Sequence, residues 1–411
     1  METINQIGTF DVENYGDLLY PLVLNNFIKR LERPVDLRLY SLIGGAAPQH
    51  AGYEISPLQN LIDVGQKRSV RIVVGGGDLL RTDSDVIAAH YGKIYRGHFE
   101  RLRSAAGVVD FLAYQLRERV AIGRRRNDYA QRFKRRHMSH SGSGPFLLDP
   151  ADLFPGSSVS YLSCGAPHEF TGEEKGEVAS LFERAQFVYL RDEQSAEKLQ
   201  RAGVRRRLHV APDLTVLLSE QFDQATVARK GRETLARFGV DPQRPLLCFQ
   251  SKPYPGFSEE EIVAQLEHYR RKTESEIVLL PLGYCHDDHK FLQLLAKRSA
   301  GSFKYLDLYS VFDIISVIAA SDLFIGTSLH GNITAFSFGI PHLMGPLPID
   351  KAEGFLRVVG LPTEFKLRSW KEMGEKIEML GACKEVLPAL VRKAQARVHS
   401  VTDMLLENII K

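Results

Sequence analysis

The chain has 411 residues, of which 44% are hydrophobic and 25% are charged, and its formal net charge is +3. This composition is typical of a soluble globular protein, and the length is too great for one hydrophobic core, so we expect two domains of roughly 150–200 residues each. A net charge this small argues against a nucleic-acid partner.

The N-terminal segment and the cysteines predict the compartment. The first seven residues, METINQI, lack the basic and apolar regions of a signal peptide, and no run approaches the roughly 18 apolar residues that span a bilayer. The four cysteines are far apart and form no CxxC pair, which argues against a disulfide framework. We therefore expect a cytoplasmic protein.

The first half of the chain alternates extended and helical patterns. The expected strands are residues 35–42, 71–78, 158–164 and 187–190. The expected helices are one that opens near residue 16 and two more at residues 172–186 and 195–201. A basic helical insertion is expected near residues 84–150.

A second alternating series follows a polar stretch at about residues 219–244. Its expected strands are residues 246–250, 277–282, 303–308 and 323–325, and its expected helices are residues 258–272, 288–298 and 310–320. The tail from about residue 383 reads as one long helix. Two such series predict an α/β fold of two Rossmann-like, doubly wound domains facing a cleft, with residues 1–225 in the first and 226–411 in the second.

The most informative segment covers residues 322–341 and contains His330. It predicts a buried strand, a tight turn that holds His330, and a short helix that ends before a proline. Ligands of open parallel sheets bind where strands lead into helices, and the backbone N–H groups just after His330 would face an anion placed there. Ser328, Gly331 and Asn332 make the turn polar and open to a ligand. A histidine with a purely structural role is the alternative.

The loop before the first predicted helix contains Asn14, Gly16 and Asp17. At the mouth of a cleft, the glycine would let a ligand approach the backbone, and the asparagine would bind a hydroxyl group. The alternative is a structural role, with Asp17 as the N-cap of the helix.

A glycine-rich loop containing Gly76, Gly77 and Asp78 follows a valine-rich strand. Consecutive glycines cost conformational entropy, which a closely passing ligand or chain segment commonly offsets. The loop is neither a GxGxxG nor a Walker A sequence, so no nucleotide site is predicted, and a structural tight turn is the alternative.

Arg191 ends a predicted strand and precedes a helix. A guanidinium in that place can bind a carboxylate or phosphate through two parallel hydrogen bonds. A salt bridge to Asp192, Glu193 or Asp213 is the alternative.

The stretch Leu280–His289 contains one cysteine, two histidines and two aspartates. Residues this close in sequence cannot all face one ion, and the aspartates are explained as helix caps, so no metal site is predicted. Instead, His286 or Asp288 is expected to contact a sugar or a base, and Gly283 is expected to contact a substrate.

Residues 116–137 contain nine lysines or arginines against Glu118 and Asp128. Most such runs are solvated faces. Because this one has a single sign, the alternative is docking on anionic lipid headgroups, or on a lipid-diphosphate acceptor, at the inner face of the cytoplasmic membrane.

Six short motifs, in this order, resemble the polysaccharide pyruvyl transferase family. They are Asn14–Asp17, Gly75–Asp78, Arg191–Ser195, Ala211–Asp213, Leu280–Gly283, and Ser328–Leu329–His330–Gly331 with Ala335 and Gly339–Pro341. The resemblance extends over most of the chain, from residue 8 to 360. It implies a GT-B-like fold, in which two Rossmann-like domains face each other.

Members of that family move the enolpyruvyl carbon skeleton of phosphoenolpyruvate to two hydroxyls of a sugar, as a cyclic ketal, and release phosphate. The resemblance implies that Arg191 holds the anionic groups of the donor and that His330 acts in acid–base catalysis, which suits an imidazole. It implies no metal and no further cofactor, with phosphoenolpyruvate as donor and a sugar or lipid-linked saccharide of a glycan precursor as acceptor.

One position departs from the family. Many members have arginine two residues before the histidine, where this chain has Ser328. The missing charge would come from Lys252, Arg81 or Lys351. Two other hypotheses stay open: a GT-B-type glycosyltransferase with a nucleotide-sugar donor, and a non-catalytic binding module that kept the fold.

Overall fold

The computed structural model describes residues 2–31, 34–46, 52–88, 90–91, 133–134, 137–138, 144–347, 350–381 and 384–410. Most of the basic insertion near residues 84–150, and of the run 116–137 within it, lies outside the described residues, so membrane docking stays a prediction. Among the described residues, no helix combines the length and the apolar character that crossing a bilayer requires.

Eight strands form the first sheet, in the order β3-β4-β2-β1-β5-β6-β7-β8. Neighbouring strands are parallel except β3 and β4. The strands are β1 (Glu2–Ile7), β2 (Val35–Ser41), β3 (Gly45–Ala46), β4 (Glu54–Pro57), β5 (Arg71–Gly77), β6 (Ser158–Cys164), β7 (Phe187–Leu190) and β8 (His209–Val210). The central strands β5 and β6 are buried along almost their whole length, as apolar runs covered on both faces should be.

Five parallel strands form the second sheet, in the order β11-β10-β9-β12-β13. They are β9 (Leu246–Gln250), β10 (Glu276–Leu279), β11 (Phe303–Tyr305), β12 (Leu323–Gly326) and β13 (His342–Met344). The order changes direction between β9 and β12. Ligands of open sheets bind outside the carboxyl ends of strands at such a place, and β12 leads directly to His330.

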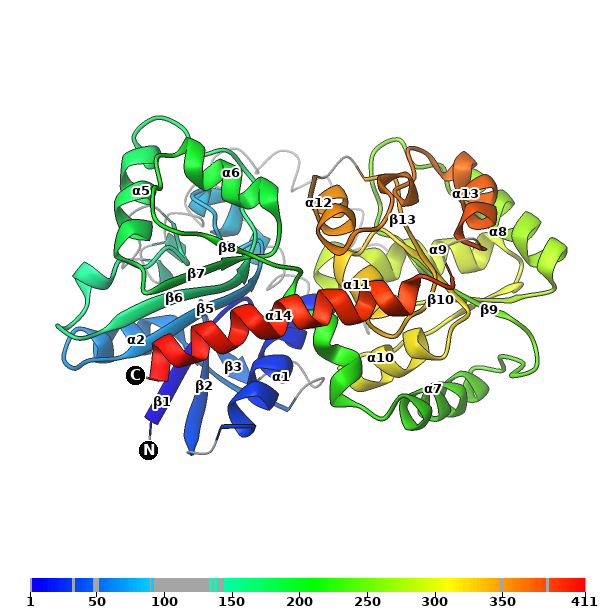
Figure 1. Cartoon of the computed structure of the whole chain (residues 1–411). Helices are drawn as coiled ribbons and strands as arrows, with labels where there is room; N and C mark the ends of the chain where they lie inside the picture. Colours follow the sequence, from blue (N-terminus) through cyan, green and yellow to red (C-terminus); the bar gives the residue numbers. More distant parts are fainter. Residues whose placement is uncertain are drawn as a thin grey trace, which may run out of the picture.

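Helices flank both sheets (Figure 1), and the predicted α/β fold of two doubly wound domains is confirmed. The α-helices are α1 (Tyr15–Lys29), α2 (Leu58–Gly65), α5 (Glu174–Arg184), α6 (Glu193–Arg201), α7 (Gln224–Arg237), α8 (Glu259–Thr273), α9 (Asp288–Arg298), α10 (Val311–Ala319), α11 (Leu329–Ser337), α12 (Asp350–Val359), α13 (Met373–Leu380) and α14 (Leu387–Ile410). Short 3-10 helices are η1 (Pro150–Asp152), η2 (Leu214–Gln221), η3 (Tyr284–His286), η4 (Thr363–Phe365) and η5 (Trp370–Glu372).

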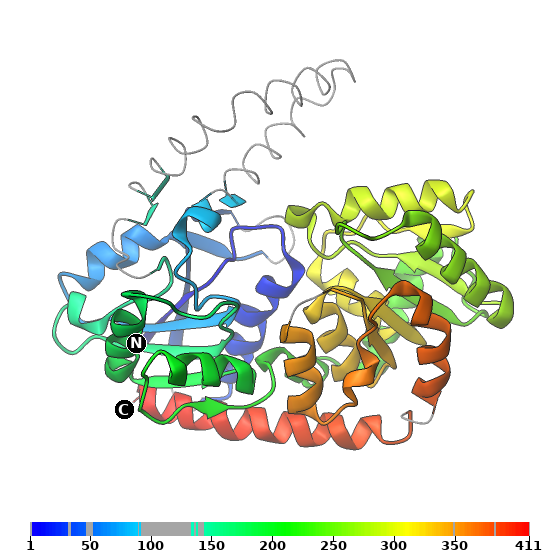
Figure 2. The same ribbon diagram turned by 90° about the horizontal axis from the view of Figure 1, so that it is seen from above.

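The predicted long C-terminal helix, α14, runs alongside both domains (Figures 1 and 2). On the way, Gln395 donates through Nε2 to the carbonyl of Val216 at 3.1 Å. Near its end, the carbonyl of Asn408 accepts from Nε2 of Gln186 at 2.5 Å, which is a contact with the first domain. The proposed boundary at residue 225 stays a prediction, but the helix of the second half packs on the first.

Two local predictions at helix starts are corrected. Helix α11 begins at Leu329, so His330 lies in the first helical turn rather than in a turn before the helix. Helix α1 begins at Tyr15 with Asn14 in the N-cap position, so Asp17 lies in the first turn and is not the cap. In both cases the helix starts earlier than its apolar periodicity suggests.

The two domains are in direct contact beside these helix starts. The N–H of Tyr15 donates to the carbonyl of Leu282 at 2.9 Å, and Asn14 forms an isolated antiparallel bridge with Gly283. The start of α1 in the first domain is therefore fixed against the loop after β10 in the second.

Candidate active site

His330 lies where the two domains meet. Its Nε2 is 2.9 Å from the hydroxyl of Tyr20 and 3.8 Å from Oδ2 of Asp213. The Tyr20 hydroxyl donates to that same carboxylate oxygen at 2.6 Å, so we assign the hydrogen on Nε2 as donated to the phenolic oxygen. Nδ1 is then the ring atom of His330 that can accept a proton.

Two glycines of the first domain make room for these rings. A Cβ atom on Gly16 would lie 2.0 Å from Nδ1 of His330, and one on Gly76 would lie 2.1 Å from the ring of Tyr20. Gly76 also has a φ of +91°, which favours glycine. Both glycines were predicted as ligand contacts, and the structure shows that they shape the site by lacking side chains.

Burial lowers the pKa of the His330 imidazole to about 4. Asp213 opposes this effect, whereas the charges of Arg191 and Lys351 add to it. The ring is therefore neutral at neutral pH and can accept a proton as a general base. Burial and the charge of Asp213 raise the pKa of Tyr20 well above its usual value, so the phenol keeps its hydrogen.

Arg191 stands directly after β7, and its side chain is only 4% exposed. Nη2 donates to Oδ1 of Asp78, while Nε and Nη1 lie 3.7 Å and 3.9 Å from carboxylate oxygens of Asp192 and Asp213. The ion pairs considered as the structural alternative are thus present at Asp192 and Asp213. The guanidinium is shared among carboxylates of its own chain rather than turned to solvent.

Asp78 joins two cations from different domains. Its Oδ1 accepts from Arg191, and its Oδ2 accepts from Nζ of Lys351 at 2.9 Å. Burial by itself would raise the pKa of Asp78, but the charges of Lys351 and Arg191 outweigh burial and hold the pKa well below its usual value. Asp78 is therefore ionised and links the end of β5 to α12. The sequence did not predict this contact.

Lys252 is partly buried just after β9. Its backbone N–H donates to Oγ1 of Thr327 at 3.3 Å, and in the part of the chain that the structure describes its ammonium forms no ion pair. Burial and the charge of Lys351 lower its pKa. A bound anion would reverse that shift, so Lys252 is well placed to interact with an anionic ligand.

The backbone N–H groups that the first turn of α11 can offer to a ligand differ from the ones that the sequence predicted. The N–H of Gly331 donates to Oγ of Ser328 at 3.3 Å, and that of Asn332 donates to the Ser328 carbonyl at 3.2 Å. The prediction that amides after His330 face an anion is therefore corrected. The amides of Leu329 and His330 have no acceptor among the described residues, as is usual for the first residues of a helix.

The side chain of Asn332 is 1% exposed and holds this turn in place. Nδ2 donates to the carbonyls of Gly326 and Ser328 at 2.9 Å and 2.8 Å, whereas Oδ1 has no hydrogen-bond partner among the described residues. Leu329, Asn332 and Lys351 all border one small hollow beside the turn. A buried acceptor without a partner at such a place is a feature of binding sites.

Asn14 and Asp17 bind each other, through Nδ2 and Oδ2 at 2.9 Å. Burial raises the pKa of Asp17 to about 6. Gly77 was predicted to lie in a loop but is the last residue of β5, and a Cβ atom on it would lie 3.1 Å from Oδ1 of Asp17. The glycine-rich end of β5 therefore packs against this carboxylate. Together with the bridge from Asn14 to Gly283, these contacts bring four predicted residues to one edge of the site.

The loop after β10 is held by Asp288. One of its carboxylate oxygens, Oδ2, accepts from the N–H groups of Leu282 and Gly283 at 2.8 Å and 2.7 Å, which gives this aspartate a structural role. His286 is exposed, and its ring stacks on that of His90 with centroids 5.4 Å apart. No metal site was predicted from the stretch Leu280–His289 alone. The structure places His90 of the first domain beside this stretch, as a further potential ligand.

Sequence reasoning missed Tyr20 and named Lys351 only as one of three substitutes for the missing arginine. Tyr20 lies one helical turn after Gly16, and Asp213 was expected only as a possible salt-bridge partner of Arg191 and not as a neighbour of His330. Tyr20 could have been proposed from the sequence, because it is a polar residue on the same face of α1 as Gly16. No sequence signal pointed to the pairing of Lys351 with Asp78.

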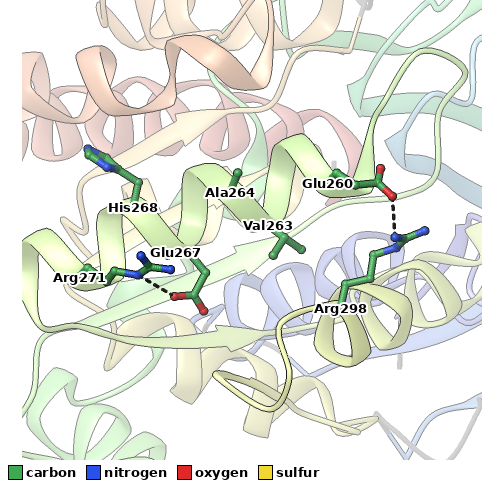
Figure 3. A pocket seen from close by; sticks show the side chains of 7 residues that line it. All are labelled: Glu260, Val263, Ala264, Glu267, His268, Arg271 and Arg298. Atoms are coloured by element: carbon green, nitrogen blue, oxygen red, sulfur yellow. Dashed lines mark ion pairs between the residues drawn. The ribbon is translucent and has the colours of Figure 1, made fainter.

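A surface depression of about 590 Å³ lies elsewhere, along α8 (Figure 3). Its charged side chains pair with each other, Arg298 with Glu260 at 2.5 Å and Arg271 with Glu267 at 3.6 Å. None of the residues that line it was marked by the sequence. We interpret it as a solvated helix face.

Solved structures with the same architecture define the class of this fold as GT-B-like. UDP-GlcNAc 2-epimerase from Neisseria meningitidis, bound to UDP-GlcNAc, matches with a TM-score of 0.53 and 12% identity over 100% of both chains. Anabaena Alr3699/HepE in complex with UDP and glucose matches with a TM-score of 0.52 and 12% identity, also over 100% of both chains. The H548A form of the wall teichoic acid polymerase TagF matches with a TM-score of 0.51 and 10% identity, over 99% of this chain and 89% of that one. At these identities the likeness shows the fold alone.

The sequence itself gives the family. Residues 14–344 match the family model of polysaccharide pyruvyl transferase, which covers most of the chain, so the chain belongs to that family. Membership supports transferase activity and implies a donor and a saccharide acceptor. A search of curated proteins finds no match.

Proposed function

We propose that this protein transfers the pyruvyl group of phosphoenolpyruvate to two hydroxyls of a saccharide, as a cyclic ketal, and releases phosphate. The observation that carries the proposal is the neutral His330, oriented by Tyr20 and Asp213, beside a cluster of cations at the junction of the domains. The family match supports the same reaction class.

His330 would act as the general base. Its Nδ1 takes the proton of the first attacking hydroxyl, whose oxygen bonds to C2 of the donor while the methylene carbon receives a proton. The second hydroxyl then bonds to C2 as the bond from C2 to the phosphate oxygen breaks. One hydroxyl proton ends on the new methyl group and the other on phosphate, so the reaction needs no oxidant or reductant. Tyr20 and Asp213 hold the ring and stabilise its charged form.

The carboxylate and phosphate of the donor need positive partners. Lys252 and the amides of Leu329 and His330, which have no acceptor in the described part of the chain, are on the side of the site where the family arginine is replaced by Ser328. Lys351 adds a second cation from α12. We propose that these groups take over the role of the missing arginine, while Arg191 keeps Asp78 in place for its contact with Lys351.

A second candidate is a glycosyltransferase with a nucleotide-sugar donor. The observation that favours it is the GT-B-like fold, shared with a protein solved with UDP and glucose. Both reactions use donors and saccharide precursors of the cytoplasm, which is where we propose that the protein works.

A thermal-shift titration separates the two, because a ligand that binds only the native state raises the melting temperature. The wild-type protein is titrated with phosphoenolpyruvate, with UDP-sugars and with inorganic phosphate. We expect a saturable rise with phosphoenolpyruvate that is weakened in Lys252→Met and kept in Lys297→Met, an exposed lysine of α9. A rise with a UDP-sugar alone would overturn the proposal in favour of the glycosyltransferase. No rise with any ligand would favour the non-catalytic binding module.

A further inference from the structure

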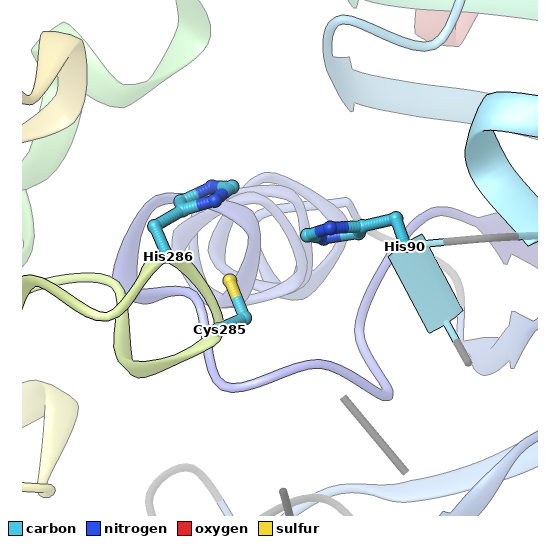
Figure 4. Close-up of side chains that lie close together, drawn as sticks. All are labelled: His90, Cys285 and His286. Carbon is cyan, nitrogen blue, oxygen red and sulfur yellow. The ribbon is translucent and has the colours of Figure 1, made fainter. Parts of the chain in front are cut away.

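Three potential metal ligands gather on the edge of the domain junction. One ligand atom each of His90, Cys285 and His286 lies within 4.8 Å of the other two, and the side chain of His90 points toward the other two (Figure 4). His90 belongs to the first domain, whereas Cys285 and His286 lie on η3 of the second. The cluster therefore joins segments that are almost two hundred residues apart in sequence.

The chemistry of the three groups suits one kind of ion. A thiolate and two imidazoles are ligands for Zn²⁺ and for similar borderline cations, whereas Mg²⁺ and Ca²⁺ prefer oxygen. With bonds of about 2.3 Å to sulfur and about 2.0 Å to nitrogen, tetrahedral ligand atoms lie about 3.5 Å apart. The ligand atoms lie within 4.8 Å of one another, and His286 is exposed and His90 partly buried, so their side chains have room to rotate toward an ion.

Both segments are anchored in the structure without an ion. Next to His90, the side chain of Tyr91 is 1% exposed, and its hydroxyl donates to Oδ1 of Asp11 at 2.8 Å. On the other side, Asp288 fixes the turn just before η3 through two backbone N–H groups, and the N–H of Cys285 donates to the carbonyl of Glu13 at 3.4 Å. Ligands presented by fixed backbone lose little entropy when an ion binds.

The electrostatic surroundings of the thiol also favour a cation. The side chain of Cys285 is buried, and the acidic side chains of Asp17, Asp288 and Glu13 interact with it electrostatically. The same three carboxylates attract a divalent cation, whose binding would displace the thiol proton.

We propose that His90, Cys285 and His286 form a binding site for Zn²⁺ or a similar borderline divalent cation, with water in a fourth position, that ties the two domains together beside the candidate active site. The site does not depend on the reaction proposed above. An ion bound there would link the two domains, because its ligands come from both and because the bridge between Asn14 and Gly283 lies next to it.

Cobalt provides a direct test, since Co²⁺ bound through a cysteine gives a thiolate-to-metal charge-transfer band. The full-length protein is freed of metal with a chelator, titrated with Co²⁺, and then titrated with Zn²⁺ as competitor. We expect one ion per chain, a charge-transfer band that Zn²⁺ abolishes, and a higher melting temperature with Zn²⁺. Absence of the band in the wild-type protein would overturn the proposal.

Variants show whether these three residues hold the ion. Cys285→Ser should abolish the band, and His286→Gln should weaken binding at least about tenfold. Because His286 is exposed, its replacement leaves the core intact and keeps the test valid if Cys285→Ser fails to fold. His268→Gln, an exposed histidine on α8, is the control and should bind as the wild type does. Equal binding by His286→Gln and wild type, or a band that persists in Cys285→Ser, would refute the site.

Discussion

The site has an imidazole side, formed by His330, Tyr20 and Asp213, and a cation side, where Arg191, Lys252 and Lys351 gather around Asp78. The imidazole side is a chain of hydrogen bonds, and glycines of the first domain pack closely against its rings. The cation side is held by charge, and its Lys252 forms no ion pair among the described residues. A hydrogen-bonded chain fails when one member changes, whereas a charge can be supplied from several positions. This difference explains how the family arginine could be replaced by Ser328 while His330 is kept.

The imidazole side should be the more sensitive to mutation, and His330→Gln tests this most directly. Loss of a general base lowers the turnover number by about 10²–10⁴-fold. Phosphate release in the presence of phosphoenolpyruvate and acceptor measures the effect, while the melting temperature shows that the fold persists. A fall of less than tenfold would mean that another residue is the base.

The pH dependence of the free energy of unfolding tests whether the His330 imidazole is buried in its neutral form. In the folded state the pKa of His330 is about 4, lower than the ordinary 6.5 of the unfolded chain, so between these values the unfolded state binds more protons. The free energy of unfolding of the wild type, relative to His330→Gln, should therefore rise with pH from about 4 to 6.5, by up to about 3 kcal/mol. Above that window the difference should be constant. Urea unfolding of both proteins across the pH range measures it, and a flat difference would contradict the burial of a neutral ring.

Gly16→Ala tests the fit between the glycine and the imidazole. The added Cβ would lie 2.0 Å from Nδ1 of His330, so α1 or the ring must move, at a cost of about 1–3 kcal/mol. Denaturant unfolding gives the stability loss, and activity should fall with it. Gly176→Ala in α5 is the matched control, because no atom lies within 4 Å of its added Cβ, and it should stabilise by up to about 1 kcal/mol. An equal response of the two variants would argue against the close fit.

On the cation side, Ser328→Arg should have the smallest effect. The new side chain restores the charge of the family pattern, but Lys252 and Lys351 already supply positive charge there, so the KM for phosphoenolpyruvate should change less than about threefold. Loss of the Ser328 cap on Gly331 should cost about 1 kcal/mol of stability. Steady-state kinetics and thermal unfolding measure the two effects separately. A KM lowered by about tenfold or more would indicate that the lysines do not replace the missing arginine.

The sequence predicted the buried parallel strands well. The strands at 187–190 and 246–250 have the bounds expected from their apolar runs. Strand β1 was not predicted, because its sequence is polar, yet Gln6 is fully buried and Asn5 is buried with its side-chain amide bound to the carbonyl of Arg71. Polar side chains in a buried strand remove the apolar signal on which such predictions depend.

The candidate site could be predicted only where its residues lie in short motifs. His330, Arg191 and the glycines stand at strand ends and helix starts, which sequence patterns mark. The bonds of Tyr20 to His330 and of Lys351 to Asp78 join residues that are distant in sequence, and periodicity carries no information on such pairs. The same limit hid the approach of His90 to Cys285.

The path of α14 has a consequence for how such proteins can be recombined. Val398 and Leu405 of this helix are fully buried, and its end contacts Gln186 of the first domain. A chimera that joins the first half of this chain to the second half of a relative at the linker would cover its first domain with a foreign helix. An exchange of acceptor or donor specificity between relatives should therefore transfer α14 together with residues 1–225.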